Sequence, residues 1–111
     1  MTPGLALFYD IADKITTNMR SYQFNNTGRA FYDTPLDTIL RQMGKDTVII
    51  CGTLTNCCCG TTARQAYERS YYVIFGSDIT STYDCEMQKA ELDILRFAFA
   101  RVMTAEEIMS M

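Results

Sequence analysis

The sequence has 111 residues, of which 48% are hydrophobic and 21% are charged, so it has the composition of one globular domain with a buried core. Its net charge of −3, with the basic residues scattered along the chain, excludes an electrostatic case for binding nucleic acid or an anionic membrane. No apolar run approaches the ~20 residues needed to span a bilayer. We therefore expect a single domain over residues 1–111, located in the cytoplasm, with neither nucleic acid nor a membrane as its partner.

The predicted elements alternate between helices and strands after residue 33. Residues 5–9 are a candidate strand, and the Asn, Thr and Gly content of the rest of the first 33 residues is typical of loops. In chain order, the apolar spacing and capping residues then predict a helix beginning at Thr34 and Pro35, a buried strand over 47–51, a helix over 57–69, a buried strand over 71–75, an amphipathic helix over 84–99, a strand over 101–104 and a short helix over 105–109. Alternation with short connections is typical of a parallel sheet built by right-handed crossovers, so the predicted fold class is α/β.

Five cysteines and the absence of histidine restrict the possible chemistry. Three of the cysteines are consecutive (Cys57, Cys58 and Cys59) and the total is odd, so we expect reduced thiols. Without histidine or paired Cys-x-x-Cys motifs a zinc site is not expected, and we expect no metal and no cofactor. Any nucleophile must therefore be activated by a carboxylate, a lysine or its place in the fold, since histidine bases are excluded.

The turn after Cys51 is the strongest candidate for a functional site. It follows the carboxyl end of a predicted parallel strand, where ligands bind in open α/β sheets. A cysteine in the first turn of the next helix lies near unpaired N–H groups and the positive end of the helix dipole, which favour thiolate and can hold an oxyanion. These arguments do not choose among Cys57, Cys58 and Cys59, and all three are also compatible with a role as small buried residues.

The segment GTLTNCCCGTTARQA, residues 52–66, resembles the G-x-x-T-N/D-x-C-x-x-x-T-A-x-x-A stretch of the isochorismatase-like cysteine hydrolases. That superfamily includes nicotinamidases, N-carbamoylsarcosine amidases and ureidoacrylate amidohydrolases. The nucleophile position of the motif falls on Cys58, whereas Cys57 and Cys59 fall on positions that are usually apolar, which predicts that they pack. The likeness extends over about residues 25–108, through FYDTPLDTILRQMGKDTVIICG and through SDITSTYDCEMQKAELDILRFAFARVMTAEEI.

This resemblance implies a three-layer α/β/α, Rossmann-like fold and a specific reaction. Cys58 would attack the carbonyl of a small amide-type substrate, release ammonia or an amine, and form a thioester that water hydrolyses. The backbone amides of Leu54 and Cys58 would form the oxyanion hole, and the peptide bond between Thr53 and Leu54 would be cis. The resemblance implies no cofactor, and we expect self-association into a homo-oligomer.

The sequence departs from the family at its other catalytic positions. The family's lysine falls on Asn25, and the chain is shorter than family domains before that point. In one account residues 5–15 are the first strand and Asp10 is the catalytic carboxylate, with an internal deletion after it. In the other, which needs no deletion and which we favour, residues 10–28 lead into the lysine strand and the true first strand is absent, so that the domain is truncated. The alternative to an amide hydrolase is therefore a catalytically impaired fragment that acts through subunit assembly.

Three further residues carry expectations. Asp78 is predicted to cap the segment that follows it. Arg64 and Glu68, spaced i, i+4, are predicted to form a solvated surface pair. Gln88 occupies the place of a family histidine near the last long helix, so no acid–base role is expected of it.

Overall fold

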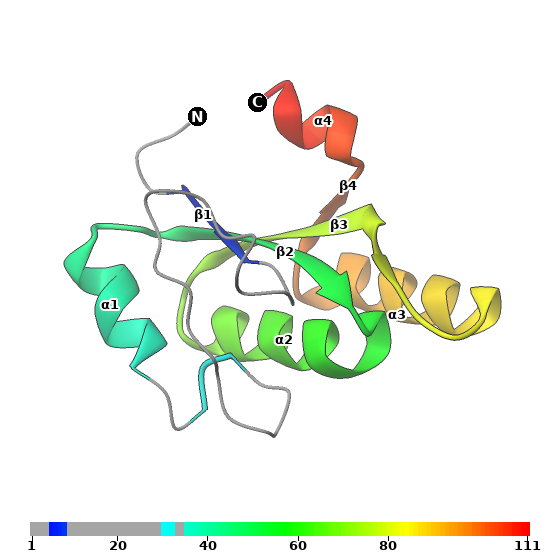
Figure 1. The fold of residues 1–111 in the computed structure, drawn as a ribbon, viewed down its shortest axis with the longest axis horizontal. Coiled ribbons are helices and arrows are strands. Elements are labelled where there is room, and N and C mark those ends of the chain that lie inside the picture. Colours follow the sequence, from blue (N-terminus) through cyan, green and yellow to red (C-terminus); the bar gives the residue numbers. More distant parts are fainter. Residues whose placement is uncertain (1–4, 9–29, 33–34) are drawn as a thin grey trace.

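The computed structural model describes residues 5–8, 30–32 and 35–111. Its centre is a four-stranded sheet in the order β1-β2-β3-β4, drawn in Figure 1. The strands are β1 (Leu5–Phe8), β2 (Thr47–Thr53), β3 (Tyr72–Ser81) and β4 (Arg101–Met103), and each pairs in parallel with its neighbour. The predicted α/β class with a parallel sheet is confirmed.

Helices lie on both faces of this sheet. They are α1 (Leu36–Gln42), α2 (Gly60–Glu68), α3 (Cys85–Ala98) and α4 (Ala105–Met109). Because the strand order follows the chain order, right-handed crossovers bring successive connecting helices to the same face. Figure 1 shows α1, α2 and α3 together on one side of the strands and α4 on the other. The described helices therefore form the two outer layers of the predicted three-layer fold.

The core divides in the same way, because side chains alternate between the faces of a strand. On the face of α1 to α3, Val48 and Phe75 belong to a buried cluster with Leu40, Ala63 and Leu95. On the opposite face, Ile49 and Ile74 are buried with Met103, and Ile108 of α4 packs against them. Both buried strand runs were predicted from their β-branched, apolar sequences.

One strand from the N-terminal region belongs to the described sheet. Strand β1 pairs in parallel with the cysteine strand β2, with Phe8 beside Ile50. A strand therefore lies where the first account places one, and the choice between an internal deletion and a truncated domain stays a prediction. The carboxylate of the first account, Asp10, lies outside the described residues, as do Asn25 and the helix cap predicted at Thr34.

Strand β3 continues beyond the point where the sequence predicts its end. Its pairing with β2 runs as far as Ile50 and Phe75, shifts, and resumes with Gly52 beside Thr80. Residues 76–79 therefore form a bulge in the pairing with β2, while Gly76 still pairs with Met103 of β4. The Thr80 hydroxyl donates a hydrogen bond to the Gly76 carbonyl across the bulge (2.7 Å). The bulge brings the last residues of β3 alongside the end of β2, where the cysteine turn begins.

The burial of α3 generates a first prediction. Leu95 is fully buried, whereas its neighbour Ile94 is 48% exposed. Leu95→Ala is expected to lower the free energy of unfolding by about 2–5 kcal/mol, because it removes core contacts and leaves a cavity. Ile94→Ala is the matched control and should cost about 0.5 kcal/mol. Urea unfolding followed by circular dichroism measures both, and equal losses would contradict this packing.

Candidate active site

The candidate site is built on the turn that joins β2 to α2. The peptide bond between Thr53 and Leu54 is cis, at the bond where the resemblance implies it. Residues Thr55–Cys59 then form a single π-helical turn, η2, which leads directly into α2 at Gly60. The sequence predicts one continuous helix from residue 57, so the wider first turn is a feature that the helical pattern did not reveal.

Backbone hydrogen bonds close this turn on one carbonyl group. The amides of Cys57 and Cys59 both donate to the Leu54 carbonyl, at 3.1 and 3.0 Å. Gly52, just before the turn, has φ 116°, a backbone conformation that side chains with a Cβ rarely adopt. The turn is therefore constrained at its entrance and through the cysteine run itself.

The three consecutive cysteines have different environments. Cys59 is buried, and its thiol lies 4.0 Å from the Cys51 carbonyl as a weak donor, which agrees with the predicted packing role. Cys57 is exposed, so the prediction that it packs is wrong. Cys58 is half-buried, which combines a defined position with access for a small molecule. All five cysteines, including Cys85, are free thiols.

Helix α3 and the end of β3 hold the turn through side-chain hydrogen bonds. Thr55, which is fully buried, donates its hydroxyl hydrogen to Oε1 of Gln88 at 2.5 Å. Nε2 of Gln88 donates to the carbonyl and the hydroxyl of Thr80, both at 3.2 Å. Asn56 accepts a hydrogen bond from the Thr82 hydroxyl at 2.7 Å. The sequence showed only that Gln88 lacks acid–base chemistry and not that its amide links three elements.

A partly buried ion pair connects α2 with α3 beside the turn. Arg64 makes two bonds to the Glu91 carboxylate, at 2.6 and 3.2 Å, and the Glu91 side chain is only 8% exposed. The predicted surface pair of Arg64 with Glu68 is therefore wrong. A Cβ at Gly60 would lie 2.0 Å from Oε2 of Glu91, so the glycine makes room for this carboxylate at the start of α2.

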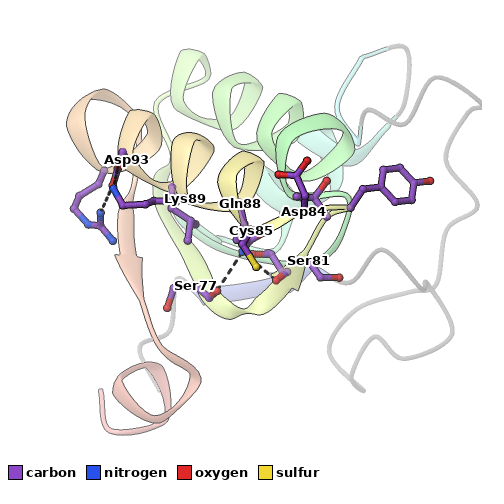
Figure 2. A pocket seen from close by; sticks show the side chains of 12 residues that line it. Ser77, Ser81, Asp84, Cys85, Gln88, Lys89 and Asp93 are labelled. Atoms are coloured by element: carbon purple, nitrogen blue, oxygen red, sulfur yellow. Dashed lines mark hydrogen bonds and ion pairs between the residues drawn. The ribbon is translucent and has the colours of Figure 1, made fainter.

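A groove of about 620 Å³ is lined in part by Gln88 and Thr80. Figure 2 shows it between the end of β3, with Ser77 and Ser81, and the α3 side chains Cys85, Gln88 and Lys89. Cys58 is not among its lining residues. Gln88 belongs both to this groove and to the hydrogen bonds that hold the cysteine turn.

Asp78 has a capping role, although not the predicted one. Its Oδ1 accepts a hydrogen bond from the amide of Ala105 at 2.8 Å. It thus caps the first turn of α4, together with the Thr104 and Glu107 capping box, rather than the segment that follows Asp78 in the sequence.

Comparison with known proteins identifies the family. The isochorismatase domain matches residues 3–107. Nicotinamidase 3 of Arabidopsis thaliana is 39% identical over 83 residues, which cover 75% of this chain and 42% of that protein. The crystal structure of an isochorismatase-like hydrolase from Alkaliphilus metalliredigens has a TM-score of 0.74 at 35% identity, over 78% of this chain and 48% of that one. The chain belongs to the isochorismatase family.

Other isochorismatase-family relatives include an amidohydrolase. The ureidoacrylate amidohydrolase RutB of Methylorubrum extorquens is 44% identical over 50 residues, covering 45% of this chain and 20% of that protein. The chain thus spans less than half the length of these curated relatives. Among the residues that the structure describes, no helix is long and apolar enough to cross a membrane. Family membership and fold are therefore shown, and the activity is a separate question.

The cysteine environments lead to a labelling prediction. Burial raises the pKa of the Cys51 thiol from 9.0 to about 11, so this thiol is neutral and enclosed at about pH 8. We expect iodoacetamide to label exposed Cys57 and Cys85 in the native protein and Cys51 only after unfolding, as read by peptide mass spectrometry. Labelling of native Cys51 as fast as Cys85 would contradict this.

The same shift predicts a pH dependence of stability. Between pH 9.0 and about 11 the folded chain holds the Cys51 proton while the unfolded chain releases it. The contribution of the Cys51 thiol to the free energy of unfolding is therefore fully present below pH 9.0, and it is lost as the pH rises through about 11. Urea unfolding at pH values across this window should show wild type losing stability more steeply than a Cys51→Ala variant.

Proposed function

We propose that this member of the isochorismatase family is a cysteine hydrolase that cleaves a carbon–nitrogen bond of a small amide-type substrate. Half-buried Cys58 is the nucleophile, and its place in the closed turn between β2 and α2 is the observation that supports the proposal most strongly. The five free thiols suit the reducing conditions of the cytoplasm, the compartment we propose.

The proposed reaction begins at the Cys58 thiol. The thiol proton passes to a carboxylate base, and the sulfur attacks the substrate's carbonyl carbon, forming a carbon–sulfur bond and a tetrahedral oxyanion. The amides of Leu54 and Cys58 stabilise this oxyanion, and one such donor is worth roughly 3–4 kcal/mol. The carbon–nitrogen bond then breaks, the nitrogen takes the proton back, and ammonia or an amine leaves. Water hydrolyses the thioester to an acid and restores the thiol.

Asp10 is the carboxylate that we propose for the proton transfers. In a parallel sheet the carboxyl ends of neighbouring strands lie at the same edge. Phe8, the last residue of β1, pairs with Ile50 of β2, and Asp10 follows Phe8 by two residues in the sequence. This arrangement supports Asp10 over a more distant carboxylate, and its role is part of the proposal.

Removing the nucleophile tests the activity. Nicotinamide and ureidoacrylate are the first substrates to assay, by release of ammonia, because the relatives' names refer to them. Cys58→Ala is expected to lower the rate by at least about 10³-fold, whereas Cys57→Ser, which changes the exposed neighbour, should stay within about twofold. Asp10→Asn should also be strongly impaired. A Cys58→Ala variant with wild-type activity would refute the proposal.

A second candidate function is assembly without catalysis, for which α3 provides an observation. Met87, Ile94 and Phe97 lie on its outer face with exposures of 47%, 48% and 92%. Three large apolar side chains on one helix face are typical of an interaction surface, and a second copy of the chain is the occupant we propose. This surface serves the homo-oligomer expected from the sequence whether or not Cys58 is active.

The oligomeric state tests that surface. Phe97→Asp is expected to shift the protein from oligomer to monomer, because it places a charge in the apolar contact, and light scattering after size exclusion measures the mass. Tyr72→Asp is the control, since Tyr72 is the first residue of β3 and its side chain is 71% exposed. Assembly that is unchanged by Phe97→Asp would rule out this surface.

A further inference from the structure

We propose that Gln88 is a positioning residue, which holds the Cys58 turn in its reactive geometry through Thr55. The inference rests on the proposed function of Cys58, and it goes beyond it by assigning a role to α3, which contributes no reacting atom. Gln88 stands where the family has a histidine, so no acid–base role was expected of its side chain.

The donors and acceptors around Gln88 run in one direction. The Thr55 hydroxyl donates to Oε1 of Gln88, Nε2 of Gln88 donates to the Thr80 hydroxyl, and that hydroxyl donates to the Gly76 carbonyl. An amide side chain offers one acceptor and two donor hydrogens on the same end, which fits this sequence of bonds. An ionised carboxylate offers only acceptors and would face the Thr80 oxygens unfavourably.

The burial of Thr55 makes this link specific to the cysteine turn. Thr55 is fully buried and is the first residue of η2, three residues before Cys58. A buried hydroxyl without a partner is costly, so loss of the Gln88 acceptor would drive Thr55 to rotate or the turn to shift. Either change displaces the amides and the sulfur that the proposed reaction uses.

The same helix holds the other side of the turn. Glu91, three residues after Gln88 on the inner face of α3, lies against Gly60, two residues after Cys58, and pairs with Arg64. Helix α3 therefore contacts the chain on both sides of Cys58, at Thr55 and at Gly60. We select Gln88 for the test because it is neutral, so its replacement by methionine alters no charge near the thiol.

The experiment compares Gln88→Met with Lys89→Met, both in a Cys57→Ser background. Lys89 is the adjacent residue on α3, and its side chain is 80% exposed in a surface ion pair with Asp93. Two quantities are measured on each folded variant: the rate at which iodoacetamide labels Cys58 as a function of pH, and amide hydrogen exchange in peptides covering residues 53–60. Thermal unfolding shows whether the fold itself has been weakened.

Gln88→Met is expected to change the rate at which iodoacetamide labels Cys58, with faster hydrogen exchange at residues 53–60 and unchanged exchange in β2 before the turn. Lys89→Met should match wild type. The effect of Gln88→Met should shrink by about threefold or more in a Thr55→Val background, because no orphan hydroxyl then remains. Unchanged labelling and exchange, or additive effects of the two substitutions, would overturn the inference.

Gln88→Glu provides a second variant if methionine prevents folding. A protonated glutamic acid has both a donor and an acceptor, so protection of residues 53–60 should match wild type at about pH 4 and fall below it at about pH 8. If residues 53–60 of Gln88→Glu were protected as well as those of wild type at both pH values, the positioning role of Gln88 would be contradicted. A failure of the proposed function would give a different result, because wild-type Cys58 would then react with iodoacetamide no faster than a free thiol. Hydrogen exchange at residues 53–60 tests the positioning role of Gln88 independently of that labelling rate.

Discussion

The carbonyl group of Leu54 accepts hydrogen bonds from the amides of Cys57 and Cys59, and this closure decides where each cysteine lies. It winds the chain into the wide turn η2 before α2 begins, and it separates the three side chains. Cys59 turns into the core toward Cys51, Cys57 faces outward, and Cys58 is left between them. Three identical residues thus have three different environments, because the backbone of the turn sets the direction in which each cysteine side chain points.

The closed turn needs support from the rest of the fold, since a wide helical turn has fewer neighbouring contacts of its own. That support comes from segments that are distant in the sequence. The bulge in β3 brings Thr80 and Thr82 to the end of β2, and α3 places Gln88 against Thr55. The same irregularity that ends regular pairing between β2 and β3 therefore supplies the polar groups that hold the cysteine turn. An ideal strand in its place would carry Thr80 past the turn rather than beside it.

Local patterns predicted the elements whose boundaries depend on neighbours in the sequence. The short helix α4 matches its prediction residue for residue, because Thr104 and Glu107 cap it locally. The bulge of β3 and the partner of Arg64 could not be predicted in this way. Arg64 pairs with Glu91, 27 residues away, and not with Glu68 one turn along its own helix. The buried Glu91 carboxylate accepts two bonds from Arg64, and Gly60 leaves the space that this carboxylate occupies. Likewise, chemistry alone left three candidate cysteines, and only the family motif selected Cys58.

The charges around Cys58 restrict how the proposed reaction can stabilise a thiolate. The sequence has no histidine, and Asn25 stands where the resemblance places a lysine. Arg64, although it lies one turn into α2, is committed to Glu91 and stacks over the Phe99 ring with 5.0 Å to its centroid, so it brings no free positive charge to the sulfur. In the proposed reaction, stabilisation of a Cys58 thiolate would then depend on the backbone dipoles of the helical turn that leads into α2. Transfer of the thiol proton to a carboxylate such as Asp10 keeps the total charge of the pair at one negative unit. The proposed reaction therefore depends on accurate placement of the Leu54 and Cys58 amides more than on a cation, and the contacts that fix the turn would provide that placement.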